Sequence, residues 1–260
     1  MTHTDTLTDA QLLRYNRQIM LPEFDVAGQL KLRKSRVLVV GLGGLGCPVA
    51  LYLAAAGVGE LVLADFDRVE VSNIQRQIAH TEADVGRLKV ESVADSVRAI
   101  NPDVSVTTVA EALDEAGLEK WVSVVDAVVD CTDNFTTREQ INAEVVKQRK
   151  IVVSGAAIRF EGQLSVFDLR RDDSPCYHCL YGMVGEQSLT CSEAGIMSPV
   201  VGIIGAAQAL ETIKVLTDTG TPVVGRLQMF DGLSGSWREF RLKRDPACPV
   251  CGTGRGSPES

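Results

Sequence analysis

Residues 36–67 read RVLVVGLGGLGCPVALYLAAAGVGELVLADFD, and this stretch decides the fold. It predicts, in order, a buried strand at 36–40, a glycine-rich turn at 41–46, an apolar helix to about Gly57 and a second strand at 61–64 that ends at Asp65. This order is typical of a nucleotide-binding βαβ unit. The pattern does not distinguish NAD from ATP, and a glycine-rich turn without a ligand is the alternative interpretation.

The glycines of this turn suit a phosphate site. Gly41 and Gly43 permit a tight turn and a close approach of the backbone to phosphate, Gly44 belongs to the same turn, and Gly46 lets the helix pack on the strand. Backbone amides at the start of the helix then face an anion, with the helix dipole behind them. Asp65 follows the second strand, where a ribose hydroxyl needs an acceptor.

The rest of the chain continues the alternation of strands and helices. A capping box at Thr8 and Gln11 predicts a helix to about Met20. Further strands are predicted at 104–109, 123–129 and 151–154, with helices ending at about Ile100 and spanning 113–121 and 136–147. Beyond Gly155, the pattern predicts antiparallel strands at 157–159, 163–169, 226–230 and 236–242, and a buried helix from Pro199 to about Leu216. We therefore expect an α/β, Rossmann-like, mostly parallel sheet that antiparallel strands extend.

Composition limits the classes of partner. A chain of 260 residues with 45% hydrophobic content can bury one large core. The net charge of −8 argues against nucleic acid and anionic membranes. The longest apolar run, 199–210, is short and contains Gln208, and the N-terminus is polar. We expect a cytoplasmic protein with no nucleic-acid or membrane partner.

The cysteines predict a metal site. Cys176 and Cys179 form one CxxC pair, and Cys248 and Cys251 form a second. Two such turns supply the four sulfurs of a structural Zn²⁺ site that fastens the C-terminal end of the chain to the second half. A redox-active pair is the alternative, but neither pair is predicted to open a helix after a strand.

Three cysteines remain outside these pairs. Cys47 and Cys131 are interpreted as small buried hydrophobic residues. Cys191 lies in a polar segment, so it is either a nucleophile or a spectator in a loop.

A set of polar residues follows the predicted strand ends or lies in the loop after Asp67, where open α/β sheets bind ligands. The set is Asp65, Asp67, Asn73, Arg76, Lys89 and Asp133. Three phosphates with Mg²⁺ need cations to spread charge and a carboxylate to hold the metal, roles that suit Arg76, Lys89 and Asp133. A nicotinamide dehydrogenase would instead need a proton-transfer residue, and His80, in a polar loop, is not placed for this chemistry.

Taken together, the motifs of this chain resemble those of the MoeB/ThiF family, the bacterial relatives of ubiquitin-activating enzymes. The motifs are RYNRQI, GLGGLG, DFD, SNIQRQ, GRLKVES, DCTDN, SGAAIRFEGQ and the paired CxxC turns, and they extend from Leu12 to about Gly252. LTCSEAGIMSP and RYNRQI bring the chain nearer to MoeB than to ThiF.

The resemblance implies an adenylyltransferase that binds ATP and Mg²⁺. Its partner would be a small ubiquitin-fold sulfur carrier, MoaD-like or ThiS-like, whose C-terminal Gly-Gly carboxylate attacks the α-phosphate. A sulfur donor then converts the acyl-adenylate to a thiocarboxylate for molybdopterin or thiazole synthesis. The chain ends soon after Gly252, so we expect a separate donor, such as a cysteine desulfurase or rhodanese.

The resemblance also implies roles for individual residues. Asp133 would hold Mg²⁺, Arg76 and Lys89 would bind the phosphates, Asn73 would support them, and Asp65 would bind the ribose. An N-terminal arginine of the family reaches the site of the neighbouring subunit, and Arg17 matches it, so we expect a homodimer. Cys191 matches a family cysteine that is a candidate for persulfide chemistry in ThiF-like members.

We expect one adenylyltransferase domain at 1–252, followed by a disordered tail at 253–260. Within the domain, 1–30 form a helical arm, 31–155 the nucleotide-binding half, and 156–252 the carrier-binding and zinc half. A NAD-dependent oxidoreductase, a non-catalytic scaffold and a family member acting on modified tRNA are the alternatives. The scaffolds of the family lack the magnesium aspartate or the arginines that this chain has, and the net charge gives no support to tRNA.

Overall fold

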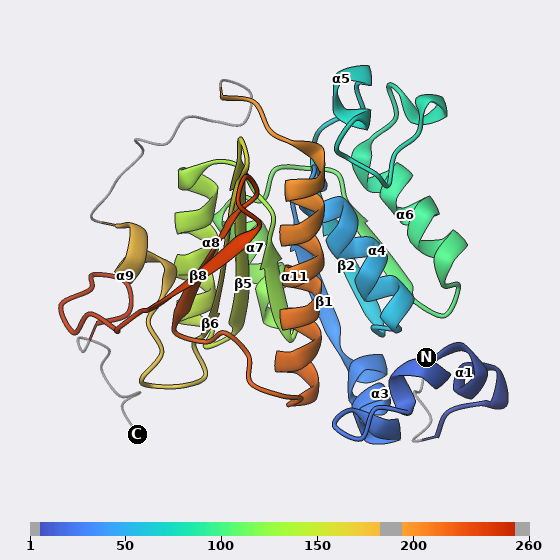
Figure 1. Cartoon of the computed structure of the whole chain (residues 1–260), viewed down its shortest axis with the longest axis horizontal. Coiled ribbons are helices and arrows are strands. Elements are labelled where there is room, and N and C mark those ends of the chain that lie inside the picture. Colours follow the sequence, from blue (N-terminus) through green and yellow to red (C-terminus); the bar gives the residue numbers. More distant parts are fainter. Residues whose placement is uncertain (1–5, 183–193, 253–260) are drawn as a thin grey trace.

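One sheet runs through the computed structural model, which describes residues 6–182 and 194–252 (Figure 1). The sheet has eight strands in the order β3-β2-β1-β4-β5-β6-β7-β8. Its parallel part consists of β1 (Arg36–Val40), β2 (Glu60–Ala64), β3 (Ser105–Val109), β4 (Ala127–Asp130) and β5 (Ile151–Ile158). The chain order reverses between β1 and β4, and open α/β sheets bind ligands at the carboxyl edge of such a point.

The antiparallel part consists of β6 (Glu161–Asp168), β7 (Arg226–Asp231) and β8 (Ser236–Arg241), joined to β5. The prediction of two strands in residues 151–159 is wrong, because β5 is continuous. The register explains this result: β6 pairs with β5 from Ile151 to Ile158, while β4 pairs only with the first four residues of β5. The two segments are therefore one strand with different neighbours on its two edges.

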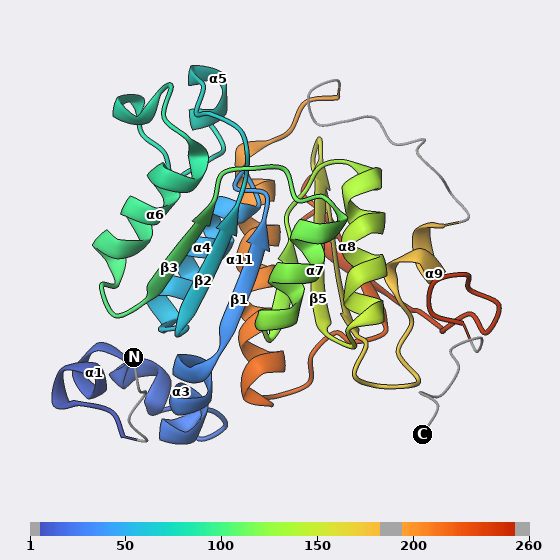
Figure 2. The ribbon, with the colours of Figure 1, turned by 180° about the vertical axis from the view of Figure 1, so that it is seen from behind.

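Helices cover both faces of the sheet (Figures 1 and 2). One face carries α4 (Gly46–Ala56), α6 (Lys89–Ile100) and α11 (Ser198–Thr217), and the other carries α7 (Glu115–Val124) and α8 (Phe135–Lys147). The helix α3 (Asp25–Lys34) lies at the end of the sheet where β1 begins and packs against α11. Each face has its own buried apolar cluster, centred on the alternate side chains of β1: Val37 and Val39 on the first face, Leu38 and Val40 on the second. Burial of both faces explains why the parallel strands are apolar throughout.

The apolar helix α11 is a core helix. It has 20 residues and is long and apolar enough to cross a membrane, but 56% of its most apolar window is buried inside the protein. Its amide side chain Gln208 is fully buried and donates to the carbonyls of Asp130 (2.8 Å) and Val153 (3.3 Å). The interpretation of this run as a buried helix is therefore confirmed, and Gln208 fastens the helix to β4 and β5.

Two predicted boundaries are wrong. The N-terminal helix is divided into α1 (Asp9–Arg14) and α2 (Asn16–Ile19) at Tyr15, which is 2% exposed and whose hydroxyl accepts a hydrogen bond from Asn101 at 2.9 Å. The helix is interrupted at Tyr15 because its ring is inserted into the core. The strand predicted from Ser123 begins at Ala127, because α7 continues to Val124 and the Ser123 hydroxyl donates back to the Lys120 carbonyl.

Three short helices complete the described residues. They are α5 (Val71–Ile74), the 3-10 helix η1 (Glu82–Asp84) and α9 (Tyr177–Tyr181). Both α5 and η1 lie in the polar segment between β2 and α6, and α9 lies between β6 and α11.

Candidate active site

A cavity of about 720 Å³ lies at the carboxyl edge of the parallel strands. Nine of the residues predicted for nucleotide binding line this cavity. They are Gly41, Gly43, Gly44, Asp65, Asp67, Asn73, Arg76, Lys89 and Asp133. The volume is within the range of about 300–1,000 Å³ that is usual for small-molecule sites. Gly46 and Arg17 do not line this cavity in the described chain, and Cys191 is outside the described residues.

The glycine turn is shaped by two close contacts. Gly41 has φ of 88°, and a Cβ there would lie 2.8 Å from the Cys131 carbonyl oxygen. A Cβ on Gly46 would lie 1.9 Å from the Gly41 carbonyl oxygen. The prediction for Gly46 therefore changes: this glycine is required by the turn itself, because only a hydrogen fits against the Gly41 carbonyl.

Asp65 braces this turn from the end of β2. One carboxylate oxygen accepts from the Leu42 amide at 2.7 Å, and the other accepts from the Asp67 amide at 2.8 Å. Each oxygen keeps a second lone pair, so the carboxylate can still accept from a ribose hydroxyl. Its role in binding ribose stays a prediction.

The cations of the cavity lie beyond β2. The Lys89 ammonium is 2.8 Å from the Asp67 carboxylate, and its side chain is only 8% exposed, against 51% for Asp67. Arg76 donates to the Ser72 carbonyl at 3.0 Å, and Asn73 accepts from the Glu70 amide at 3.2 Å. Lys89 is thus a buried charge with one carboxylate partner, in a cavity that can admit a second anion.

Asp133 also lines the cavity, after the end of β4, and its side chain is exposed. The loop that carries it is held by Arg138, which sequence reasoning missed. Arg138 donates to the carbonyls of Thr132 and Gly155, and its Nε lies 3.8 Å from the buried carboxylate of Asp130. Burial by itself would lower the pKa of Arg138, but Asp130 and nearby tyrosines outweigh it and raise that pKa.

A sequence signal for Arg138 did exist. Arg138 lies near the start of α8, the helix that follows the end of β4, and this position places it near the carboxyl edge of the sheet. Its burial against Asp130 and the end of β5 depends on contacts that the local pattern does not contain.

Two buried polar residues, Gln77 in the lining of the cavity and His80 behind it, lie in the segment expected to be a polar loop, and sequence reasoning did not indicate their burial. Gln77 and His80 are each 3% exposed. The His80 ring contacts the Ser92 hydroxyl (2.8 Å) and the Leu42 carbonyl (3.4 Å), and burial lowers its pKa. His80 does lie in a loop, as expected, but its side chain is buried, because its ring packs against the Leu42 carbonyl of the glycine turn.

Arg17 is in α2, is exposed and does not line the cavity. The N-terminal arm lies near α3, at the opposite end of the molecule from α5 (Figure 1). Within one chain, Arg17 is therefore not brought to the other predicted residues. Its action in a neighbouring subunit stays a prediction.

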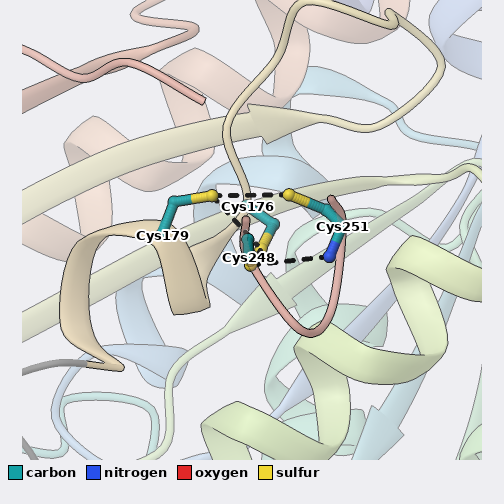
Figure 3. Close-up of side chains that lie close together, drawn as sticks. All are labelled: Cys176, Cys179, Cys248 and Cys251. Atoms are coloured by element: carbon teal, nitrogen blue, oxygen red, sulfur yellow. Dashed lines mark hydrogen bonds between the residues drawn. The ribbon is translucent and has the colours of Figure 1, made fainter. Parts of the chain in front are cut away.

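The four cysteines of the CxxC pairs form a compact cluster on the second face of the sheet (Figure 3). Their sulfurs all lie within 4.8 Å of one another, with Cys176 Sγ 3.9 Å from Cys179 and 3.8 Å from Cys248, and Cys179 3.4 Å from Cys251. Tetrahedral Zn²⁺ with Zn–S bonds of about 2.3 Å requires sulfurs about 3.8 Å apart. The cluster therefore fits a metal ion with four thiolate ligands.

The thiols of the cluster differ in acidity. The hydrogen bond from Cys176 lowers the pKa of Cys179 to about 4, whereas burial raises the pKa of Cys251 to about 11. A bound metal supplies the positive charge that deprotonates the remaining thiols. The six described cysteines are free thiols.

One reason given against a redox pair is wrong: Cys176 stands at the N-cap position of the five-residue helix α9, so the first pair does open a helix. The convergence of both pairs on one point is the stronger argument for a metal. Cys47 and Cys131 are 0% and 7% exposed, so their interpretation as buried residues is confirmed.

The sequence matches the ThiF family over residues 15–250. The chain belongs to the ThiF family. This ThiF-family chain is 51% identical to the molybdopterin-synthase adenylyltransferase of Escherichia coli over 246 residues, which cover 95% of the chain and 98% of the relative. It is 44% identical to the sulfur carrier protein ThiS adenylyltransferase of the same organism, covering 97% of the chain and 100% of the relative. The resemblance inferred from the sequence is confirmed.

Other ThiF-family relatives are longer. The adenylyltransferase and sulfurtransferase MOCS3 of Anopheles gambiae is 44% identical over 94% of this chain, but the match covers 56% of that protein. Among solved structures, PaaA has a TM-score of 0.80 and 27% identity, with 94% of this chain and 77% of PaaA covered. E. coli MccB crystallised with ATP has a TM-score of 0.77 at 24% identity, and the match covers 87% of this chain and 69% of MccB. This likeness shows a shared fold.

Proposed function

We propose that this ThiF-family enzyme uses ATP to adenylylate the C-terminal Gly-Gly carboxylate of a small ubiquitin-fold sulfur carrier. The observation that carries the proposal is the cavity in which the glycine turn, Arg76, Lys89 and Asp133 meet. Identity of 51% to a molybdopterin-synthase adenylyltransferase, along nearly the whole of both chains, supports a MoaD-like carrier. A ThiS-like carrier is the second candidate, supported by 44% identity to a ThiS adenylyltransferase.

The reaction needs positioning and charge neutralisation. The carrier carboxylate is already a nucleophile, so it attacks the α-phosphate without a general base, and pyrophosphate leaves. The barrier lies in bringing two anions together and in the charge of the leaving group. Amides of the glycine turn and the side chains of Arg76 and Lys89 would offset that charge, with Lys89 exchanging part of its interaction with Asp67 for the phosphates.

The acidic residues of the cavity fit a hydrated divalent cation. Asp133 is exposed and lines the same cavity as the cations, and carboxylate oxygen is the ligand that Mg²⁺ prefers. Bound Mg²⁺ would supply positive charge to the triphosphate and the departing pyrophosphate. We assign Asp133 to hold it, and we assign Zn²⁺ to the four-cysteine cluster as a structural ion.

We further propose that the enzyme works in the cytoplasm as a homodimer, as one domain with a helical arm. The sulfur for the later thiocarboxylate would come from a separate donor, a cysteine desulfurase or rhodanese. The carrier would bind to the half of the chain formed by residues 156–252.

Exchange of labelled pyrophosphate into ATP tests the proposed activity. Exchange is expected only when a carrier with a free Gly-Gly end is present, because the carrier carboxylate is the nucleophile. A carrier without its last two glycines is the matched control. Equal exchange with the truncated carrier would reject the proposal, and tight NAD binding without ATP binding would favour an oxidoreductase.

The trans role of Arg17 predicts complementation between two inactive variants. Arg17→Ala and Asp133→Ala should each be inactive alone, whereas an equal mixture should regain about a quarter of the wild-type exchange rate. The reason is statistical: half of the dimers are hybrids, and each hybrid has one site with both residues intact. Native mass spectrometry confirms that subunits have exchanged. No recovery despite confirmed exchange would contradict the trans role.

A further inference from the structure

Asn142 is a buried polar residue beside the four-cysteine cluster. It lies in α8 and is 1% exposed. Its carboxamide spans two consecutive residues at the start of α9: Nδ2 lies 3.6 Å from Cys176 Sγ, and Oδ1 lies 2.9 Å from the Tyr177 backbone nitrogen. Buried polar groups normally have hydrogen-bond partners, and both partners of this carboxamide belong to the segment that carries the first CxxC pair.

The Tyr177 amide fixes the direction of this carboxamide. A backbone N–H can only donate a hydrogen bond, so the oxygen of Asn142 must face it, and the amino group must face the sulfur of Cys176. The fold therefore directs a donor at this sulfur, which has to act as the acceptor. A charged acceptor forms the stronger hydrogen bond, so the arrangement suits a Cys176 thiolate, the form that binds a metal.

A second donor is directed at another sulfur of the cluster. The Cys251 backbone amide donates to Cys248 Sγ at 3.5 Å. Four thiolates around one divalent cation keep a net charge of about −2, and a buried charge is costly unless hydrogen bonds compensate it. Donors to Cys248 and Cys176 offset part of that negative charge. Groups that donate to metal ligands also orient those ligands and increase metal affinity.

We propose that Asn142 is a positioning residue for the metal of the four-cysteine cluster: its amino group donates to the Cys176 thiolate, while its oxygen holds the first amide of α9. The proposal rests on the assignment of Zn²⁺ to the cluster under the proposed function. Tyr177 lines the cavity, so the same side chain fastens both a metal ligand and one wall of the active site.

The test compares Asn142→Asp, Asn142→Leu and Asn101→Leu. Aspartate keeps the shape and the acceptor for the Tyr177 amide but replaces the donor with an oxygen, whereas leucine removes both. Asn101 is the matched control, because it is 0% exposed and donates to the Tyr15 hydroxyl and the Ala54 carbonyl, outside the cluster. Competition with a chromophoric chelator gives the Zn²⁺ dissociation constant, and absorption spectra are recorded after Co²⁺ has replaced Zn²⁺.

The Zn²⁺ dissociation constant is expected to rise about 10- to 100-fold in both Asn142 variants, because loss of a group that orients a metal ligand typically has an effect of this size. The sulfur-to-cobalt charge-transfer band should move to longer wavelength, since a hydrogen bond lowers the energy of the sulfur lone pairs and its loss raises that energy. Asn101→Leu should lower the melting temperature, but its Zn²⁺ dissociation constant should stay within about twofold of wild type and its cobalt spectrum should not change.

Wild-type Zn²⁺ affinity and an unchanged cobalt spectrum in Asn142→Asp would overturn the inference, because this variant removes only the donor. A loss of affinity in Asn142→Leu alone would assign Asn142 to the capping of α9 instead. If neither variant folds, a crystal structure of the zinc-loaded wild-type protein decides: Nδ2 within hydrogen-bond reach of Cys176 Sγ supports the inference, and Nδ2 turned away from it overturns it.

Failure of the proposed function is a different result from these. A wild-type protein without zinc, as measured by elemental analysis, would reject the assigned metal. A wild-type protein with zinc but without carrier-dependent pyrophosphate exchange would reject the adenylylation, and the measurements on Asn142 do not depend on that activity.

Discussion

Replacing Asp133 with alanine is expected to lower ATP–pyrophosphate exchange about 1,000-fold or more, since the site would lose the carboxylate proposed to hold Mg²⁺. The side chain is exposed in the cavity, so its removal leaves no buried group unpaired. The free energy of unfolding should therefore stay within about 0.5 kcal/mol of wild type. We therefore expect a variant that has lost its activity but keeps the stability of the wild-type fold.

Two comparisons make this prediction sharp. Asp133→Asn keeps the shape but loses the charge, and it should be nearly as inactive as alanine. Asp172→Ala removes a carboxylate that is 86% exposed, pairs with Arg149 and does not line the cavity, so it should retain full exchange. Exchange at the wild-type rate in Asp133→Ala would refute the role of this residue.

The second large effect concerns the four-cysteine cluster. Replacing Cys251 with serine is expected to abolish metal binding and to remove much of the stabilisation by the metal, which is on the order of 10 kcal/mol in apparent terms for structural zinc. Cys251 and Cys248 lie close to the C-terminal end of the described chain, and they bring it against Cys176 and Cys179. Without the metal, residues 245–252 and α9 should loosen first, and the βαβ unit last.

Hydrogen exchange with mass spectrometry measures the order of loosening, and elemental analysis measures bound zinc. Cys47→Ala is the matched control, because Cys47 is equally buried and lies outside the cluster, so that variant should keep its zinc. A Cys251→Ser protein with zinc still bound, or with unchanged exchange at residues 245–252, would contradict a metal clip.

The helix α9 connects the four-cysteine cluster to the cavity. Between its first two cysteines, α9 carries Tyr177, and Tyr181 follows in the same helix; both tyrosines line the cavity. Their rings lie 4.5 Å apart, and the Tyr181 hydroxyl donates to Gln163 of β6. Loss of the metal should therefore reduce exchange as well as stability, through the wall of the cavity that α9 forms.

The tertiary structure departed from the sequence prediction at particular places. Tyr15 divides the N-terminal helix because its ring enters the core, and β5 continues past Ser154 because β6 pairs along its whole length. In both cases a partner distant in the chain outweighs the local pattern. Gln77 and Arg138, which line the cavity, and His80, which does not, are polar groups whose burial also depends on distant partners.

The sequence by itself determined the βαβ unit, the family and the two cysteine pairs. The physical reason is that these features are encoded locally: strand and helix periodicity, glycines that only a tight turn requires, and thiols three residues apart. Only the tertiary structure decided that Lys89 is buried against Asp67, that Arg138 links β4 to β5, and that Gln77 stands beside Gly43. These are contacts between separate elements, and their geometry exists only once the sheet has brought the strand ends together.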